Sequence, residues 1–238
     1  MIRSAASALV VSVLYAVPAA QPPRAAPDES DLARLETALA ADADDLRAGN
    51  DYRMEAIRLA RYDRALAFFE RLVADHPEAS NAHLNYGFAY VDKIPVAGAI
   101  TQVILANKAL GEFSRALELR PTWIGYYTRG NSYLFWPKIF RRTRLGVADL
   151  EEALRRQRSG DRHAYHVRTY ISLGDAYWIA DDAGKAVETW HEGIAEFPGN
   201  ALLTARLAAK DEGIKAIIDT AYDYTLRVDT NLDDLWTR

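Results

Sequence analysis

The sequence predicts an all-α solenoid built from repeated pairs of helices, and three observations predict it. One glycine–aromatic pattern recurs along the chain at the spacing of two packed helices. A proline or another helix-breaking group follows each copy of that pattern. Hydrophobic residues make up 50% of the chain and charged residues 26%, which is the balance of an ordinary globular protein with a core to bury.

The clearest copy of the pattern lies between residues 170 and 198. It consists of Tyr170, Leu173, Gly174, Tyr177, Ala186, Trp190 and Pro198. Gly174 has no side chain and therefore lets two helices cross closely, and the large side chain of Trp190 fills the space at the same crossing. Leu173 and Tyr177 fill the seam between the helices. Pro198 ends the second helix, because a proline ring clashes with a continuing helix.

Earlier parts of the chain repeat this pattern with small changes. The recurring positions are Ala65, Phe69, Leu72 and Pro77; Gly87, Tyr90, Ala109, Phe113 and Pro121; and Gly130, Tyr133, Gly146, Leu150 and Ala153. The last of these sets is followed by Ser159-Gly160-Asp161 in place of a proline.

These motifs resemble the tetratricopeptide-repeat (TPR) family, and the resemblance covers residues 46 to 200. It implies a right-handed superhelical solenoid of about four helix-turn-helix units that stack on their neighbours. The units are expected at about 46–79, 80–122, 123–162 and 167–200. An N-terminal helix precedes them from residue 31, and an atypical capping hairpin at 201–227 ends the stack, so that the solenoid spans 31–227. The tail at 228–238 either docks through Leu232 and Trp236 or frays.

The first thirty residues are expected to lie outside this fold. Residues 1–20 carry one early positive charge, an apolar run and then small residues, which is typical of a secretory signal peptide. Residues 21–30 form a proline-rich flexible leader. A secreted, periplasmic protein with no membrane span after signal removal is therefore expected; an uncleaved anchor is the alternative. The chain contains no cysteine, which excludes disulfides and thiolate metal sites.

Two units carry insertions at the tip between their helices. About ten extra residues lie at 93–102, and they predict a lengthened helix ending near Leu119 after a turn at Pro95. About four extra residues lie at 135–138, within a segment that is unusually rich in aromatic residues and is followed by arginines. The two tips form either a docking ridge, since aromatic and arginine side chains are typical interface anchors, or a structural packing device.

The resemblance implies that a protein or peptide partner binds on the concave face, which the first helix of each unit lines. An amide-rich and aromatic surface suits an extended peptide. The candidate partner-binding residues on this face and on the tips are Asn81, Asn85, Phe88, Tyr127, Asn131, Phe135, Trp136, Arg141, Arg142, Arg168, Asp175 and Trp178. The lysine–asparagine carboxylate clamp of chaperone-tail receptors is absent from the corresponding positions.

Other functional classes find less support. The chain has no nucleophile elbow, phosphate loop or zinc-protease motif, so an enzyme is not expected. His163 and His166 have a spacing that suits a metal but lack a third ligand, so neither a metal nor a cofactor is expected. The net charge of −4 and the absence of a reader motif disfavour nucleic acid. The alternative function is binding of a small molecule or lipid by the aromatic surface near 126–142; the oligomeric state stays open.

Overall fold

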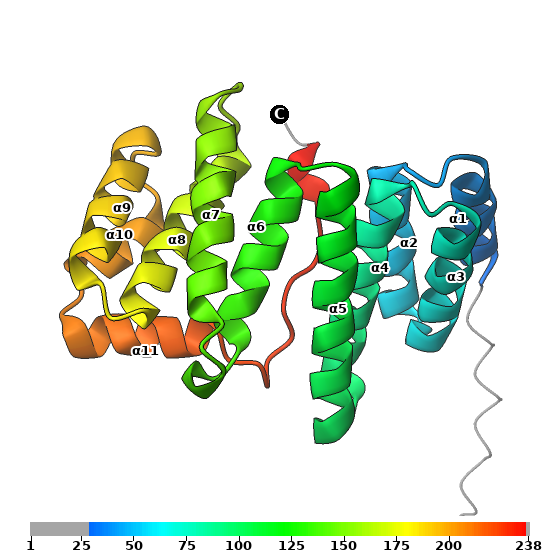
Figure 1. Ribbon diagram of the computed structural model, residues 1–238, viewed down its shortest axis with the longest axis horizontal. Coiled ribbons are helices and arrows are strands. Elements are labelled where there is room, and N and C mark those ends of the chain that lie inside the picture. The colour runs from blue at the N-terminus through cyan, green and yellow to red at the C-terminus, as the bar shows by residue number, and fades with distance from the viewer. Residues whose placement is uncertain (1–28, 237–238) are drawn as a thin grey trace, which may run out of the picture.

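The computed structural model describes residues 29–236, and within this range it is helical and has no strand (Figure 1). The predicted signal peptide and most of the predicted leader lie outside the described residues. The α-helices are α1 (Ser30–Ala41), α2 (Leu46–Arg58), α3 (Tyr62–Asp75), α4 (Ser80–Lys93), α5 (Ala99–Leu119), α6 (Trp123–Ser132), α7 (Thr143–Arg158), α8 (Val167–Ile179), α9 (Ala183–Glu196), α10 (Ala201–Ala208) and α11 (Asp211–Ala221). The short 3-10 helices are η1 (Ile94–Val96), η2 (Tyr133–Phe135), η3 (Lys138–Phe140), η4 (Ala164–His166) and η5 (Asp233–Leu235).

The helices stand side by side in a row, from α1–α3 at one end to α9 and α10 at the other (Figure 1). Consecutive helices form antiparallel pairs, α2 with α3, α4 with α5, α6 with α7 and α8 with α9, and each pair packs on the next. This arrangement confirms the predicted all-α repeat fold. No helix within residues 29–236 has both the length and the apolar character needed to cross a membrane.

The pairs are held together at glycine–aromatic crossings, as the motif predicts. A Cβ atom on Gly174 would lie 2.2 Å from the indole nitrogen of Trp190, and one on Gly87 would lie 2.3 Å from a ring carbon of Phe113. Trp190 and Phe113 are fully buried. The absence of a side chain on each glycine therefore lets the next helix approach and lets one large aromatic ring fill the seam.

The first insertion lengthens one helix and shapes its tip. The helix α5 runs for 21 residues, and the short helix η1 with Pro95 in its first turn precedes it. The lower end of α5 extends beyond the neighbouring helices, and the connection between α6 and α7 also extends toward this edge (Figure 1). The two insertions thus lie on the same edge of the solenoid.

The end of the chain departs from the repeat. Helix α11 runs across the lower edge of the row instead of standing beside α10 (Figure 1). Ala209 and Lys210, which join the two helices, are both extended, and Ile214 and Ile218 of α11 are buried in the same core as Trp190. After α11 the chain turns up between α6 and α4 and reaches η5, where Asp233 contacts Asn50 of α2, so residues 230–233 dock in the concave groove.

The concave groove and its apolar cleft as candidate functional site

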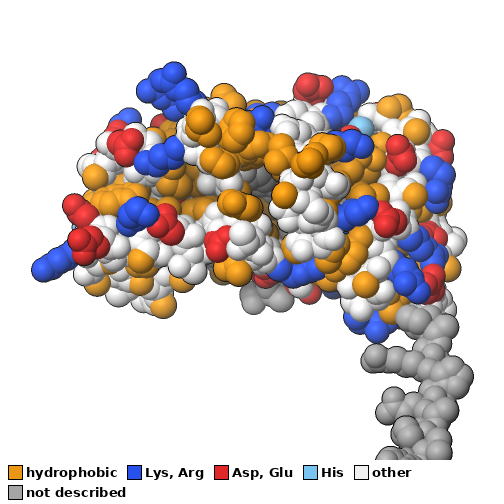
Figure 2. Space-filling view, turned by 90° about the horizontal axis from the view of Figure 1, so that it is seen from below, with side chains coloured by type: hydrophobic (Ala, Val, Ile, Leu, Met, Phe, Trp, Pro, Cys, Tyr) orange, Lys and Arg blue, Asp and Glu red, His pale blue; other side chains and the backbone are white. Residues whose placement is uncertain are grey.

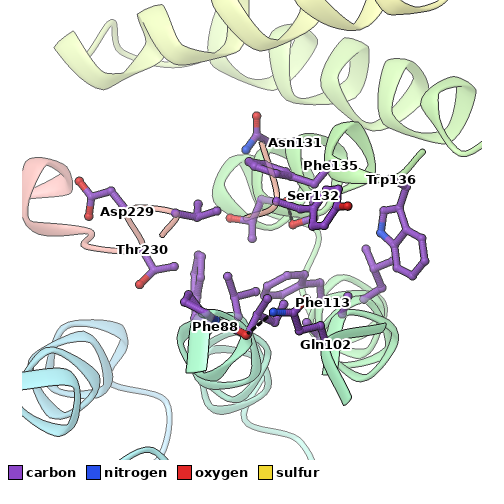
Figure 3. A pocket seen from close by; sticks show the side chains of 18 of the residues that line it. Phe88, Gln102, Phe113, Asn131, Ser132, Phe135, Trp136, Asp229 and Thr230 are labelled. Atoms are coloured by element: carbon purple, nitrogen blue, oxygen red, sulfur yellow. Dashed lines mark hydrogen bonds between the residues drawn. The ribbon is translucent and has the colours of Figure 1, made fainter. Parts of the chain in front are cut away.

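An apolar cleft opens in the concave groove between α4, α5 and α6. Its volume is about 380 Å³, and most of its lining surface is apolar. Phe88 and Phe113 line one side, Phe135 and Asn131 line the opposite side, and the C-terminal segment closes a third side near Thr230 (Figure 3). The volume falls within the range of ordinary ligand pockets. Seen from the lower edge of the molecule, hydrophobic side chains surround a hollow (Figure 2).

Both inserted tips contribute to the cleft. Val103 of α5 and Phe140 of η3 line it from the two tips, and so does Pro95. The aromatic residues of the second tip also pack on other rings: Phe135 meets Tyr222 at 5.2 Å and Trp136 meets Phe140 at 5.6 Å between ring centroids, both edge to face. The insertions therefore build the walls of a cleft, and at the same time they pack against other parts of the chain.

The C-terminal segment lies in the groove without regular secondary structure. The backbone oxygen of Thr230 accepts a hydrogen bond of 3.0 Å from Nη2 of Arg53, and the backbone N–H of Leu232 donates one of 3.0 Å to Oδ1 of Asn50. The Leu232 side chain is buried against the core. Side chains of α2 thus bind the backbone of this segment, and the groove holds one large aliphatic side chain.

A buried polar cluster supports this contact. Arg53 has no exposed surface, and its guanidinium contacts Asp92 at 3.1 Å and Asn85 Oδ1 at 3.1 Å. Asp92 also accepts a hydrogen bond from the Thr230 hydroxyl. A buried charge is tolerated where a partner and further hydrogen bonds compensate for lost hydration, and Asp92 supplies that partner.

Six of the predicted partner-binding residues line the cleft: Phe88, Tyr127, Asn131, Phe135, Trp136 and Arg168. Tyr127 stacks on Trp123 with ring centroids 5.2 Å apart, and burial raises the pKa of its hydroxyl, which stays protonated at neutral pH. Arg168 forms an ion pair with Asp234 at 2.8 Å, so the positive charge of Arg168 is already compensated by the C-terminal segment. The structure therefore brings half of the predicted set together around one space.

Two predicted contacts are at odds with the structure, because both side chains are buried in internal networks. Asp175 has no exposed surface and binds Nε and Nη2 of Arg206 at 2.6 Å and 2.7 Å. Asn85 is 1% exposed and bonds to Arg53 and to the backbone of Leu46. We therefore remove Asp175 and Asn85 from the residues that a partner could touch.

The remaining predicted residues lie outside the cleft. Asn81 bonds to Asp44 in the loop before α2, and Trp178 packs near Trp190 at 6.3 Å between ring centroids. Arg142 stacks on the Trp136 ring at 3.7 Å and donates a hydrogen bond to Asn107. Arg141 is exposed on the second tip.

The histidine pair forms an aromatic cluster. The rings of His163 and His166 are 5.2 Å apart, and His166 also packs against Trp123 at 5.0 Å between ring centroids. Burial and the neighbouring His163 lower the pKa of His166 to about 4. No group of three or more metal-ligating side chains occurs within residues 29–236.

The sequence left open whether the C-terminal segment docks or frays, and in the structure it docks with Leu232 buried and Trp236 packed against the core. Sequence reasoning missed the two residues of α2 that hold it. Asn50 and Arg53 lie in α2, one helical turn apart, and both are fully buried. A possible signal was this pair of polar residues directly beside Tyr52 and Ala56, which are buried in the core.

The comparisons with known proteins concern the fold. No protein-family model matches the chain, and the search of curated proteins found no relative. Among solved structures, the chain is similar to TTC0263, a thermophilic TPR protein of Thermus thermophilus, with a TM-score of 0.56 and 19% identity over 77% of this chain and 89% of that one. It is also similar to YrrB, described as a TPR protein with an unusual peptide-binding site, with a TM-score of 0.51 and 15% identity over 84% of this chain and 88% of that one. Together with the glycine–aromatic crossings, these similarities show that the chain has the tetratricopeptide-repeat fold.

Proposed function

We propose that this protein is a scaffold of the cell envelope that holds an extended segment of a protein partner in its concave groove. One observation carries the proposal. The groove already holds a segment without regular secondary structure, its own residues 228–232, and an apolar cleft of about 380 Å³ stays open beside it. Because Asn50 and Arg53 are already used by this segment, a partner segment would bind in the open cleft beside it.

The cleft indicates which kind of segment would fit. Phe88, Phe113 and Phe135 make its walls apolar, whereas Asn131 and Ser132 offer a few polar atoms at one side (Figure 3). Large aliphatic or aromatic side chains of a partner would gain the most from entering, because burial of apolar surface contributes roughly 25 cal/mol per Å². Oδ1 of Asn131 already accepts a hydrogen bond from Ser172, so its Nδ2 group would donate to a backbone carbonyl of the partner. The peptide-binding site named for YrrB is consistent with this use of the fold.

The location is part of the proposal. Residues 1–20 have the order of a signal peptide, with an early positive charge, an apolar run and small residues before a proline-rich stretch. A chain exported in this way from a bacterium with two membranes would meet its partner in the periplasm. Separation of periplasm from cytoplasm, followed by mass measurement of the mature chain, tests the location and the cleavage.

Site-specific photocrosslinking in cells tests the partner. A photoreactive phenylalanine analogue replaces Ala106, which lines the cleft, and in a matched control it replaces Ala40, which is exposed on α1 at the far end of the row. We expect one dominant protein adduct from position 106 and none from position 40. Peptide mapping of that adduct should locate a segment rich in large apolar residues.

A blocked cleft provides the second arm of the test. Ala106→Trp fills the cleft, and Ala40→Trp adds the same side chain to an exposed surface. A synthetic peptide of the mapped segment should bind the wild-type protein and Ala40→Trp equally, and Ala106→Trp at least tenfold more weakly. Equal binding by all three folded proteins would remove the cleft from the proposal, and identical adducts from both crosslinker positions would do the same.

A small apolar molecule or a lipid is the second candidate for the same cleft. The observation that favours it is the size of the space together with its mainly apolar lining, which is typical of small-molecule pockets. Native mass spectrometry of the purified protein would then show a bound mass that is absent from Ala106→Trp and present in Ala40→Trp. A wild-type spectrum without any added mass argues against this candidate.

A further inference from the structure

The exposed hydrophobic residues of this protein are concentrated at one edge. Eleven large hydrophobic side chains are exposed within residues 29–236, and nine of them lie in three short segments, 96–104, 139–145 and 224–226. The nine are Val96, Ile100, Val103, Ile104, Ile139, Phe140, Leu145, Tyr224 and Leu226. Single exposed hydrophobic residues are ordinary, but a concentration of this kind marks an interaction surface. We call these three segments the apolar edge.

The three segments lie close together in space although they are far apart in sequence. The start of α5, the connection between α6 and α7, and the loop after α11 all lie at the lower edge of the row (Figure 1). Val103, Phe140 and Leu226, one from each segment, line the same cleft. The view from below shows hydrophobic side chains on both sides of the hollow (Figure 2).

Several of these side chains point to solvent and not into the cleft. Ile100 is 82% exposed and Ile139 is 83% exposed, and neither lines the cleft. They lie on two tips that project separately from the solenoid, so they do not form a groove for a helix or a strand. A broad apolar layer would contact both tips at once.

Cations accompany the apolar side chains. The second tip reads Lys138-Ile139-Phe140-Arg141-Arg142-Thr143-Arg144-Leu145, with four basic residues among eight. Arg141 and Arg144 are exposed and have no carboxylate partner within the described residues, whereas Lys138 contacts Asp181 at 3.2 Å. Apolar side chains between unpaired arginines are the composition that binds the interface of an anionic bilayer, where rings and aliphatic groups enter the headgroup region and cations meet phosphate.

We propose that the apolar edge docks this protein on an anionic lipid membrane, with the mouth of the cleft facing the lipid. Ile100, Ile104, Ile139 and Phe140 enter the headgroup region, and Arg141 and Arg144 contact the lipid phosphates. This docking is distinct from the binding of a partner segment inside the cleft, since only Phe140 of these six residues lines the cleft. A partner that reaches the cleft of the docked protein would approach along the membrane surface.

Vesicle flotation tests the proposal. The protein is prepared from Gln21, which keeps every described element and removes the apolar run at 5–17, because that run would bind lipid by itself. We expect binding to vesicles of phosphatidylcholine with 30% phosphatidylglycerol, and at least tenfold weaker binding to phosphatidylcholine alone. Ile100→Ser combined with Phe140→Ser should weaken binding at least tenfold.

Matched variants separate docking from a general effect of exposed hydrophobic residues. Val187→Ser with Leu202→Ser removes two exposed side chains away from the apolar edge and should leave binding unchanged. Arg141→Glu with Arg144→Glu should remove the preference for phosphatidylglycerol. A wild-type protein that fails to float with anionic vesicles, or that binds neutral vesicles equally well, overturns the proposal.

A second measurement does not depend on how well the serine variants fold. Because the chain contains no cysteine, Ile100→Cys and Leu202→Cys can each carry one environment-sensitive fluorophore. Anionic vesicles should shift the emission of the label at position 100 to shorter wavelength and leave that at position 202 unchanged. Equal shifts at both positions, or no shift at position 100, contradict docking through this edge.

Discussion

Arg53 of α2 donates a hydrogen bond of 3.0 Å to the backbone oxygen of Thr230, which lies 177 positions later in the chain. The same guanidinium contacts Asp92 of α4 at 3.1 Å, so one buried side chain connects two helices of the groove with the C-terminal segment. Burial of an arginine removes its hydration, and this network compensates for the loss with an ion pair and further hydrogen bonds. The tail is therefore a fixed part of the groove.

Arg53→Met should lower the free energy of unfolding by about 3–5 kcal/mol, because it leaves the Asp92 carboxylate buried without its cation. Urea unfolding measures this loss. Hydrogen exchange should also become faster at the amide of Leu232, since the segment loses its anchor at Thr230.

An exposed ion pair serves as the control for that change. Arg34 contacts Asp31 at 3.1 Å on the surface of α1, and Arg34→Met should cost less than about 1 kcal/mol. Arg53→Met combined with Asp92→Leu should recover part of the loss, because no unpaired charge remains. Equal effects of Arg53→Met and Arg34→Met would contradict the assigned role of Arg53.

Two glycines should respond to alanine in opposite directions. Gly87→Ala should lower the free energy of unfolding by about 2 kcal/mol or more, because the new Cβ would lie 2.3 Å from the ring of Phe113. Gly111→Ala in α5 meets no atom within 4 Å and should raise stability by about 0.5–1 kcal/mol, because alanine is the better helix former. Thermal and urea unfolding of both variants check the two signs, and a destabilised Gly111→Ala would contradict the open space at that position.

The glycine–aromatic crossings were predictable because they depend on local spacing. Gly174 and Trp190 are sixteen positions apart, a distance that one helix pair fixes, and the motif therefore gives both the contact and its reason. The lengthened α5 was predictable in the same way, since extra residues inside a repeat must enter its helices or its turn. The resemblance to the repeat family rests on these local relationships.

The polar interior could not be predicted in this way. Asp175 lies on the face of α8 that was expected to be concave and accessible, but Arg206 of α10 and Tyr222 cover it. The tail has no repeat pattern that would give its register, and its contact between Thr230 and Arg53 spans most of the chain. Contacts of this kind depend on the orientation of α11, because it determines the direction in which the chain continues. No sequence pattern predicts that orientation.

His166 should make the protein less stable as the pH falls below 6.5. Its pKa is lowered from 6.5 to about 4 by burial and by His163, so the unfolded chain binds the proton more tightly. The contribution of His166 to the free energy of unfolding is complete above pH 6.5. It decreases as the pH falls toward 4, by up to roughly 3 kcal/mol. Urea unfolding between pH 4 and pH 7 measures this dependence.

Two glutamine variants isolate that effect. His166→Gln should flatten the pH dependence between 4 and 6.5, because no group with a lowered pKa remains at that position. His191→Gln changes an exposed histidine of α9 and should leave the dependence as in the wild type. A wild-type dependence in His166→Gln would assign it to other groups.

Trp136 and Arg141 should separate the two proposed binding events. Trp136 lines the cleft, and its replacement by alanine should weaken binding of the partner segment by about 2 kcal/mol, or roughly thirtyfold, as is typical of a buried aromatic anchor. Arg141 is exposed outside the cleft, and Arg141→Ala should weaken binding to anionic vesicles while peptide binding stays unchanged. Peptide titration and vesicle flotation of both variants give four results. If one variant lost both activities while its unfolding curve matched the wild type, the cleft and the apolar edge would act as one surface, since the separation depends on Trp136 facing the cleft and Arg141 facing the solvent.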